Sequence, residues 1–501
     1  MYLYNELEGR VIDKPPDMFD RDFEWSELVR FATHKADGPV LGIVSGRRRQ
    51  GKTFLLDALT QAAGGLMFTA TEATAAESLR EFGSALASFR NEPAPYRFGN
   101  WDEALSQLLH SPSGTPPVAV LDEFPYLVRQ APELPSLLQR QLDPGARRSG
   151  SQIRLLLCGS AMSFMGKLLS GGAPLRGRAA LELIVPTFDF RLAARFWDIA
   201  DPRTAVLANA VVGGTPAYRR EFSQFDTPSG PSDFGSWVIR TVLNPARPLF
   251  REARYLLAEE PDLRDTALYH SVLAAIAGGN TTRGGIASFL ARSSTDLAHP
   301  LGVLEDAGLI TRDADLFRGN RSAYRIAEPM VAFYHAIMRP AWGDLERPGR
   351  AAEVWRRMQQ TFASKVVGPH FERLCREWSH WYAAPETFGG YQAVVGSGSI
   401  SDRRERILHE IDIVVLSQRD AAQPELLCLG EAKWNTVLTP GHLDRLARIR
   451  DRLRKHPSVT ATDRTRLALY SGAGFSAELR EIAGRAADVV LVDLDRLYHG
   501  E

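Results

Sequence analysis

A glycine-containing loop near the start of the chain constrains the fold more than any other feature. An apolar run at about 40–45 leads into GRRRQGKT over residues 46–53, and three leucines then recur at helical spacing. In this order the backbone N–H groups of the loop and of the following helix N-terminus surround a phosphate group. Lys52 would reach the outer phosphates, and Thr53 would offer its hydroxyl to Mg²⁺. The stretch therefore predicts a P-loop on a parallel sheet.

Two further apolar runs end in polar residues. PVAVLD ends at Asp122 and is followed by Glu123, and IRLLLCG is followed by Ser160. Charges are tolerated where the strands of a parallel sheet emerge at their carboxyl ends, so Asp122 is predicted to help hold Mg²⁺ and Glu123 to polarise the attacking water. Ser160 is predicted to sense the terminal phosphate, although Gly-Ser after a strand is also an ordinary turn. The residues predicted to bind ATP are Gly46, Arg47, Arg48, Arg49, Gln50, Gly51, Lys52, Thr53, Phe54, Asp122 and Ser160, with Thr53 and Asp122 at the metal.

Composition restricts the class of protein. From its length alone, a chain of 501 residues is expected to hold about three domains, and 44% hydrophobic with 24% charged residues is ordinary globular composition. Lysine plus arginine equal aspartate plus glutamate at 60 each, so a nucleic-acid partner must be sought locally. Three cysteines without CxxC spacing exclude a disulfide framework, and no apolar run approaches the roughly 18 residues of a membrane span. A soluble cytoplasmic protein without a membrane partner is expected.

The middle of the chain is predicted to be helical and then to form a winged helix. Residues 208–262 have the pattern of a helical lid or connector, and 263–345 give three helices and a hairpin whose turn is expected at Gly319 and Asn320. Residues 263–340 contain 8 Lys or Arg and 7 Asp or Glu, which is almost no surplus for binding phosphates. DNA reading, protein docking and a mechanical role all stay open for this module.

The last third contains two strand-like runs with carboxylates, EIDIVVL with Asp412 and LGEAKW with Glu431. An antiparallel pairing would make these two carboxylates neighbours, which is unfavourable unless something binds them. A divalent metal such as Mg²⁺ or Mn²⁺ would do so, and Lys433, on the same strand face, could activate a metal-bound water. A lysine that merely bridges two carboxylates in a salt bridge is the alternative. A later helix carries a stripe of basic residues, which are Arg445, Arg448, Arg452 and Lys455. This stripe could follow a phosphate backbone or serve solubility.

Several motifs together resemble the archaeal-type ATPases of the STAND branch, which are AAA+ related P-loop proteins. The resemblance covers most of 15–345 and rests on FDRDFEWSEL, SGRRRQGKT, VLDEFPYL, CGSAMSFM, PLRGRAALELIVPTFDF and VVGGTPAYRREF. It implies an arginine near the phosphates, here Arg178 or else Arg176. The D...ExK pattern of Asp412, Glu431 and Lys433 resembles the PD-(D/E)xK phosphodiesterase superfamily, and this resemblance implies that Glu372 is a further metal-supporting acid.

The sequence as a whole predicts an α/β protein of four domains. They are a P-loop ATPase domain at 1–207, a helical lid at 208–262, a winged helix at 263–345 and a PD-(D/E)xK nuclease-like domain of restriction-endonuclease-like α/β fold at 346–501. The expected function is Mg²⁺-dependent ATP hydrolysis coupled to a metal-dependent nuclease that acts on DNA, with a homo-oligomer or a protein partner also expected. Two alternatives are a STAND-type signalling or defence switch with a non-catalytic docking module, and a DNA-stimulated motor. The catalytic residues are expected to be Lys52, Glu123, Arg178, Asp412, Glu431 and Lys433, with Asp412, Glu431 and Glu372 at the second metal.

Overall fold

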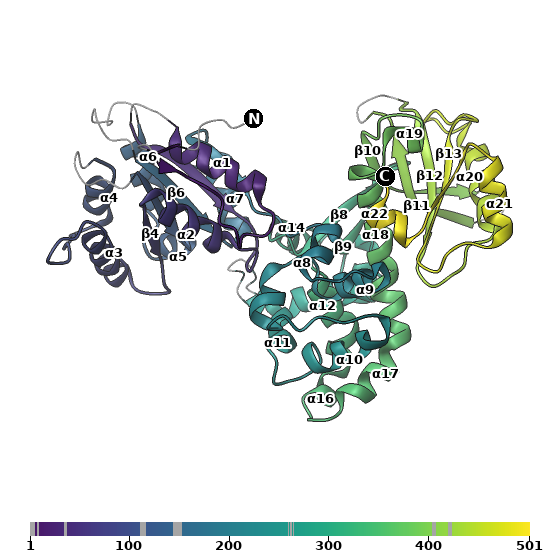
Figure 1. Ribbon diagram of the computed structural model, residues 1–501, viewed down its shortest axis with the longest axis horizontal. Coiled ribbons are helices and arrows are strands. Elements are labelled where there is room, and N and C mark those ends of the chain that lie inside the picture. Colours follow the sequence, from purple (N-terminus) through teal and green to yellow (C-terminus); the bar gives the residue numbers. More distant parts are fainter. Residues whose placement is uncertain are drawn as a thin grey trace. The chain divides into compact units, whose positions relative to one another are not determined.

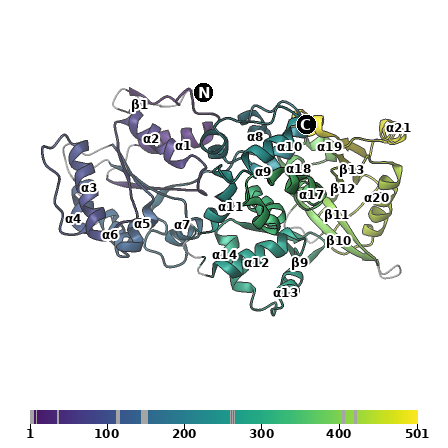
Figure 2. The same cartoon turned by 90° about the horizontal axis from the view of Figure 1, so that it is seen from below.

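The structure is a computed structural model. In it the chain divides into two compact units (Figures 1 and 2). The first is Met1–Thr187 with Glu260–Asp262, and the second is Phe188–Glu259 with Leu263–Glu501. In the described ranges, no helix is long and apolar enough to cross a bilayer. The structure describes residues 6–7, 10–34, 38–110, 117–143, 153–258, 260, 263, 265–402, 407–418 and 423–501.

The first unit is built on a parallel sheet of five described strands, which confirms the predicted α/β architecture (Figure 1). Neighbours pair in parallel register, with Ser45 opposite Gly159 and Thr69 opposite Asp122. The carboxyl ends of the strands therefore meet at one edge of the sheet. The order across the sheet is β4 (Leu66–Thr69), β5 (Val118–Asp122), β6 (Arg154–Gly159), β3 (Val40–Ser45) and β7 (Ala179–Ile184). Two short strands, β1 (Glu6–Leu7) and β2 (Arg10–Val11), form a separate antiparallel pair.

Helices bury both faces of this sheet because successive strand residues point to opposite sides. Ile43 and Leu121 pack with one set of helices, whereas Val44 and Val120 pack with the other. The first set includes α3 (Ala75–Phe89), α4 (Trp101–His110) and α6 (Leu134–Leu142), and the second includes α1 (Asp22–Thr33) and α2 (Lys52–Ala63). Two shorter helices, α5 (Phe124–Gln130) and α7 (Met162–Leu169), begin just after β5 and β6. Charged groups of the central strands are therefore confined to the strand ends.

The second unit opens with helices that pack around aromatic side chains. Trp237 lies edge-on to Trp197 at 5.8 Å, and Phe234 stacks on Phe362 at 5.8 Å between ring centroids. The predicted lid region at 208–262 spans the end of α9 (Pro202–Val212), the π-helical turn η1 (Tyr218–Phe222), and the whole of α10 (Pro231–Thr241) and α11 (Leu249–Ala258). The helices before the hairpin are α8 (Phe190–Phe196), α9 (Pro202–Val212), η1 (Tyr218–Phe222), α10 (Pro231–Thr241), α11 (Leu249–Ala258), α12 (Thr266–Ala277), α13 (Arg283–Phe289) and α14 (Ala298–Asp306).

The hairpin after α14 pairs β8 (Ile310–Asp315) with β9 (Arg318–Ile326), so three helices followed by two strands occur in the predicted order. Its turn, however, lies at Leu316 and Phe317 and not at Gly319 and Asn320. The Asp315 carboxylate accepts hydrogen bonds from the backbone N–H groups of Phe317 and Arg318 at 2.9 and 3.1 Å. A carboxylate that bonds the backbone two residues on fixes a turn at that place.

The hairpin also belongs to the sheet of the last third of the chain, since Asp315 pairs in parallel with Ser397. Seven described strands follow in the order β14 (Val489–Val492), β13 (Arg466–Ser471), β12 (Leu426–Lys433), β11 (Ile407–Leu416), β10 (Val394–Asp402), β8 and β9. One face packs on α18 (Gly368–Trp381), and the other packs on α20 (Pro440–Leu453) and α21 (Ala477–Arg485). The remaining elements are α15 (Pro329–Phe333), η2 (Tyr334–Met338), η3 (Arg339–Ala341), α16 (Trp342–Leu345), α17 (Ala351–Thr361), η4 (Phe362–Val367), α19 (Pro385–Phe388) and α22 (Leu494–His499).

Asp315 holds the hairpin to β10, because its carboxylate also accepts hydrogen bonds from the backbone N–H and the hydroxyl of Ser399. We expect Asp315→Ala to lower the free energy of unfolding by about 2 kcal/mol, since hydrogen bonds to a charged group are lost from several donors at once. Urea denaturation followed by circular dichroism measures this change. Asp306→Ala, at an exposed carboxylate of α14, serves as the control, and an equal loss in both variants would contradict the proposed role of Asp315.

Candidate functional site

The glycine-containing loop connects β3 to the first turn of α2, as expected. Gly46 and Gly51 have φ angles of +151° and +86°, which glycine adopts without strain. A Cβ at Gly46 would lie 2.5 Å from the Val185 carbonyl oxygen, whereas a Cβ at Gly51 would meet nothing within 4 Å. The loop is therefore packed against the sheet at its start and faces open space where α2 begins.

Four predicted residues meet at the carboxyl edge of the sheet. The Thr53 hydroxyl donates to Asp122 Oδ2 at 2.9 Å, and the backbone N–H of Glu123 donates to Asp122 Oδ1 at 3.0 Å. The Ser160 hydroxyl donates to the Glu123 carboxylate at 3.2 and 3.3 Å. Ser160, which is 3% exposed, thus contacts the predicted base, and its sequence context did not indicate this contact.

Lys52 lies at the start of α2 and is 6% exposed. Its Nζ donates to the Arg47 carbonyl oxygen at 2.8 Å. Burial lowers the pKa of Lys52, while Glu123 and Asp122 act in the opposite direction. A buried ammonium beside a loop of backbone N–H groups is a strong site for an anion, because a phosphate would compensate its charge.

The other predicted nucleotide residues lie along the loop. Arg48 Nη2 donates to the Tyr126 hydroxyl at 3.0 Å, Arg49 has a φ of 68°, and Phe54 is 39% exposed. Sequence reasoning missed Arg21, a buried arginine whose Nη2 donates to the backbone oxygens of Gln50 at 3.3 Å and Pro186 at 2.7 Å. Arg21 therefore ties the loop to the end of β7, and a lone arginine before a helix gives no sequence signal of such a contact.

Arg178 lies apart from this group. Arg178 comes just before β7. The first residue of β7, Ala179, is opposite Leu41 near the start of β3, whereas the glycine-containing loop follows the end of β3. Four steps along β3 span about 13 Å. Arg178 bonds Asp143 at 2.9 Å, and Arg176 bonds the Gly171 oxygen at 2.7 Å. The role of Arg178 at the phosphates stays a prediction, and contacts within one chain do not favour it.

The residues at the carboxyl edge fit a nucleotide with Mg²⁺. The loop and the α2 N-terminus supply N–H donors next to open space, and Lys52 supplies a positive charge. The Thr53 hydroxyl and the Asp122 carboxylate are oxygen ligands of the kind that Mg²⁺ prefers, and Mg²⁺ keeps several waters besides.

The second predicted site lies where β11 and β12 pair antiparallel, with Ile413 opposite Gly430. Lys433 Nζ lies 3.4 Å from Asp412 Oδ2 and 3.4 Å from Glu431 Oε1, so the three residues of the D...ExK pattern come together. Asp412 Oδ2 also accepts from the backbone N–H of Ala432 at 3.0 Å. Burial lowers the pKa of Lys433, but Asp412 and Glu431 outweigh it, so the pKa is raised and the amine stays charged.

Two arginines complete this group and were not predicted to belong to it. Arg445 Nη1 donates to Glu431 Oε2 at 2.8 Å, although its helical spacing predicts a basic stripe that follows a phosphate backbone or serves solubility. Arg376 Nη1 donates to the Asp412 backbone oxygen at 2.8 Å. The apolar residues of α20 face the sheet as expected, and the helix brings Arg445 over the end of β12.

Glu372 lies on α18 close enough to Asp412 to be affected by its charge. Burial raises the pKa of Glu372 to about 7, and Asp412 raises it too, whereas Arg376 and Lys433 act against the shift. Among the described residues, no three His, Cys, Asp or Glu side chains converge to hold a metal ion. The oxygen donors of Asp412 and Glu431 suit Mg²⁺ or Mn²⁺, but Lys433 and Arg445 already compensate their charge. The second metal therefore stays a prediction.

The raised pKa of Glu372 has a consequence for stability. Below its ordinary value of 4.5 the carboxyl is protonated in both folded and unfolded chains, and above about 7 it must ionise in a buried place. The stability gained from the protonated form is thus lost as pH rises from about 4.5 through 7. In EDTA, we expect the melting temperature of Glu372→Gln to exceed that of the parent by about 4 °C at pH 8 and to match it at pH 4.5. Glu386→Gln, at an exposed carboxyl, is the control, and a pH-independent difference would contradict the assignment.

A cavity of about 400 Å³ opens beside Asp412 and Glu372. Its wall includes Arg376 of α18 and Arg321 and Arg325 of β9, so the hairpin and the carboxylate group face the same space. Glu431 and Lys433 are not part of the wall. A substrate reaching the carboxylates through this cavity would pass the hairpin.

Comparisons with known proteins give distant likenesses. No protein-family model matches the sequence. An uncharacterized protein, MJECL04 of Methanocaldococcus jannaschii, is 25% identical over 309 residues, which are 61% of this chain and 65% of that protein. The chain thus spans less than two thirds of the length of this curated relative.

Three solved structures illustrate the structural likenesses. The Walker-type ATPase PABY2304 of Pyrococcus abyssi is 22% identical, with 65% of this chain and 99% of that chain covered at a TM-score of 0.46. The Aeropyrum pernix ORC2 protein is 15% identical, with 70% and 98% covered at 0.41, and a Thermotoga maritima RuvB mutant is 14% identical, with 58% and 89% covered at 0.30. Likenesses at this level do not transfer an activity, so the geometry of this chain must carry the assignment.

Proposed function

We propose that the first unit binds ATP with Mg²⁺ and hydrolyses it. The observation that carries the proposal is the 2.9 Å contact between the Thr53 hydroxyl and Asp122, next to a loop that holds a buried Lys52. A hydroxyl, a carboxylate and an ammonium at the carboxyl edge of a parallel sheet are the groups that bind a metal-bound polyphosphate.

The residues of this edge have separate tasks in hydrolysis. Bound Mg²⁺ would offset charge on the phosphate oxygens. Lys52 binds the outer phosphates, and the loop N–H groups orient them. Glu123 orients the attacking water and accepts its proton, while the Ser160 hydroxyl holds the Glu123 carboxylate in place. The predicted lid and winged helix would respond to the state of the nucleotide.

A second candidate function, metal-dependent cleavage of DNA, is favoured by Lys433, which lies 3.4 Å from both Asp412 and Glu431. A bound divalent metal would polarise a phosphodiester there. Asp412 and Glu431 would hold it, Lys433 would orient the attacking water, and Arg376 fixes the backbone at Asp412. If the domain is instead a docking module, the same ion pairs would only stabilise its fold.

One set of assays separates these functions. Phosphate release from ATP is measured with Mg²⁺ and with EDTA, and cleavage of DNA and RNA is measured with Mg²⁺ or Mn²⁺, each with and without the other substrate. Release that requires Mg²⁺ is expected, and its absence would contradict the ATPase. Stimulation of release by DNA without cleavage would indicate a motor. Nucleotide-dependent oligomers with neither DNA cleavage nor DNA stimulation would indicate a signalling switch.

A further inference from the structure

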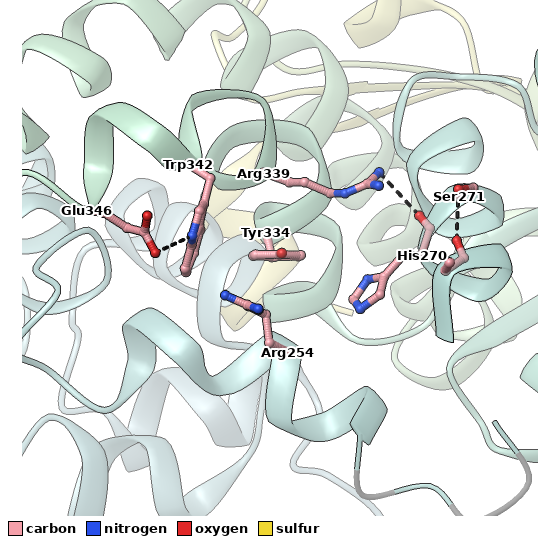
Figure 3. Close-up of a pocket in the computed structure, with 8 residues that line it drawn as sticks. Arg254, His270, Ser271, Tyr334, Arg339, Trp342 and Glu346 are labelled. Carbon is pink, nitrogen blue, oxygen red and sulfur yellow. Dashed lines mark hydrogen bonds between the residues drawn. The ribbon is translucent and has the colours of Figure 1, made fainter. Parts of the chain in front are cut away.

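A second hollow lies in the second unit (Figure 3), and none of its lining residues belongs to β11 or β12. Its volume is about 570 Å³, within the range of small-molecule sites. Residues of α11, α12, η2, η3 and α16 line it, so elements from both sides of the hairpin in sequence contribute. The lining residues are Arg254, Ala267, His270, Ser271, Tyr334, Arg339, Trp342 and Glu346.

Two arginines give this hollow a positive charge. Among the described residues, neither Arg254 nor Arg339 forms an ion pair, and Arg339 makes a long hydrogen bond of 3.5 Å to the His270 backbone oxygen. The carboxylate in the lining is Glu346, which accepts from Trp342 Nε1 at 2.7 Å. Two guanidinium groups in a small concave site, with one carboxylate already engaged, favour an anionic ligand.

A buried polar atom without a partner lies in the lining of this hollow. Tyr334 lines the hollow and is 5% exposed. In the described part of the chain, His270 Nδ1 is buried and has no hydrogen-bond partner. Both ring nitrogens of His335 are also unpartnered there; His335 is not part of the lining, but its ring centre lies 5.4 Å from that of His270. Buried polar groups are normally bonded, so unmade bonds at a cavity indicate something that occupies it.

Aromatic packing fixes the groups that would meet the ligand. Trp342 stacks on Phe250 at 4.6 Å, and the Arg254 guanidinium lies 5.1 Å from the centre of the Trp342 ring. Figure 3 shows Tyr334 between Arg254 and Arg339. Burial lowers the pKa of His270, and Arg339 and Arg254 lower it further, so at neutral pH the positive charge belongs to the two arginines.

We propose that this hollow binds a phosphate-bearing small molecule of about the size of a nucleotide. Arg254 and Arg339 bind the anionic groups, and the Tyr334 hydroxyl and His270 donate to or accept from the rest of the ligand. The proposal is independent of the P-loop, since it concerns other residues in the other unit. A nucleotide and a sugar phosphate share this chemistry, so both are used as probes.

The test is isothermal titration of full-length Lys52→Ala with AMP and, separately, with ribose 5-phosphate. The Lys52→Ala background weakens phosphate binding at the P-loop, so that heat from the hollow dominates. We expect saturable binding of at least one probe, weakened about tenfold or more by Arg254→Gln or Arg339→Gln because charge-assisted hydrogen bonds are lost. Arg251→Gln, an exposed arginine on the same helix, is the matched control and is expected to bind as the parent does.

Tyr334→Phe removes one hydroxyl without opening a cavity, and it is expected to weaken binding about threefold or more. Melting temperatures near that of the parent show that each variant is folded. The proposal is overturned if neither probe saturates below about 10 mM, which corresponds to under 3 kcal/mol of affinity. It is also overturned if Arg254→Gln and Arg339→Gln both bind as tightly as Arg251→Gln, or if a short DNA duplex displaces the probe, since the hollow would then serve nucleic acid.

Discussion

Replacing Lys52 with alanine is expected to lower the rate of ATP hydrolysis at least about 100-fold, because electrostatic stabilisation of the outer phosphates is lost. Lys52 is the first residue of α2 and is 6% exposed. Because its ammonium is held in a buried position, another lysine cannot easily replace it. The fold should persist, since removal of a buried ammonium also removes the cost of its desolvation. Phosphate release at saturating ATP measures the effect.

Two further variants make that result specific. Lys167→Ala, at an exposed lysine of α7 in the same unit, should hydrolyse ATP as the parent does. Glu123→Gln should retain binding of a fluorescent ATP analogue but lose turnover, because the amide accepts no proton. Hydrolysis of ATP by Lys52→Ala at the rate of the parent would contradict the assignment of residues 46–53 as a P-loop.

Asp412→Asn is expected to lower metal-dependent DNA cleavage by about 100-fold or more, while ATP hydrolysis stays unchanged. The substitution keeps the shape of the side chain but removes the charge that faces Lys433. Its backbone oxygen still accepts from Arg376, so the strand should keep its position. Gel analysis of a labelled DNA panel with Mg²⁺ or Mn²⁺ measures cleavage.

Asp444→Asn, at an exposed carboxylate of α20, is the control and should cleave normally. Cleavage that survives in both Asp412→Asn and Lys433→Ala would show that another site is responsible. A parent chain that cleaves no substrate would leave Asp412, Glu431 and Lys433 as a structural ion-pair group.

The first site could be anticipated from sequence because a parallel sheet aligns its strand ends. Once three apolar runs are recognised as strands, the loop after Ser45, Asp122 and Ser160 must lie at one edge. The same rule argues against Arg178, which precedes its strand and so begins at the other edge. A resemblance transfers the role of a motif, but strand direction decides which edge its residues occupy.

The second site was less accessible to sequence reasoning because it depends on contacts between distant segments. Helical spacing put Arg445 on a basic stripe, yet spacing alone does not tell which stripe lies over a carboxylate such as Glu431. The prediction of the hairpin turn at Gly319 and Asn320 was wrong for a similar reason. These residues suit a turn, but the Asp315 side chain accepts hydrogen bonds from the backbone of Phe317 and Arg318 and so fixes the turn earlier in the chain. The contact of Arg21 with the loop gave no local signal, because the two backbone oxygens that it binds lie 29 and 165 residues away.

The hairpin joins the sheet through the pair of Asp315 with Ser397, and this link bears on how the terminal domain of such a chain can be exchanged in evolution. A recombination breakpoint at 345 would separate β8 and β9 from β10, and the Asp315 bonds to Ser399 would be left without partners. A C-terminal segment transferred without the hairpin would then expose the edge of β10, and an exposed edge strand can pair with another chain and aggregate. Proteins that exchange this C-terminal domain by recombination should therefore exchange the hairpin together with it.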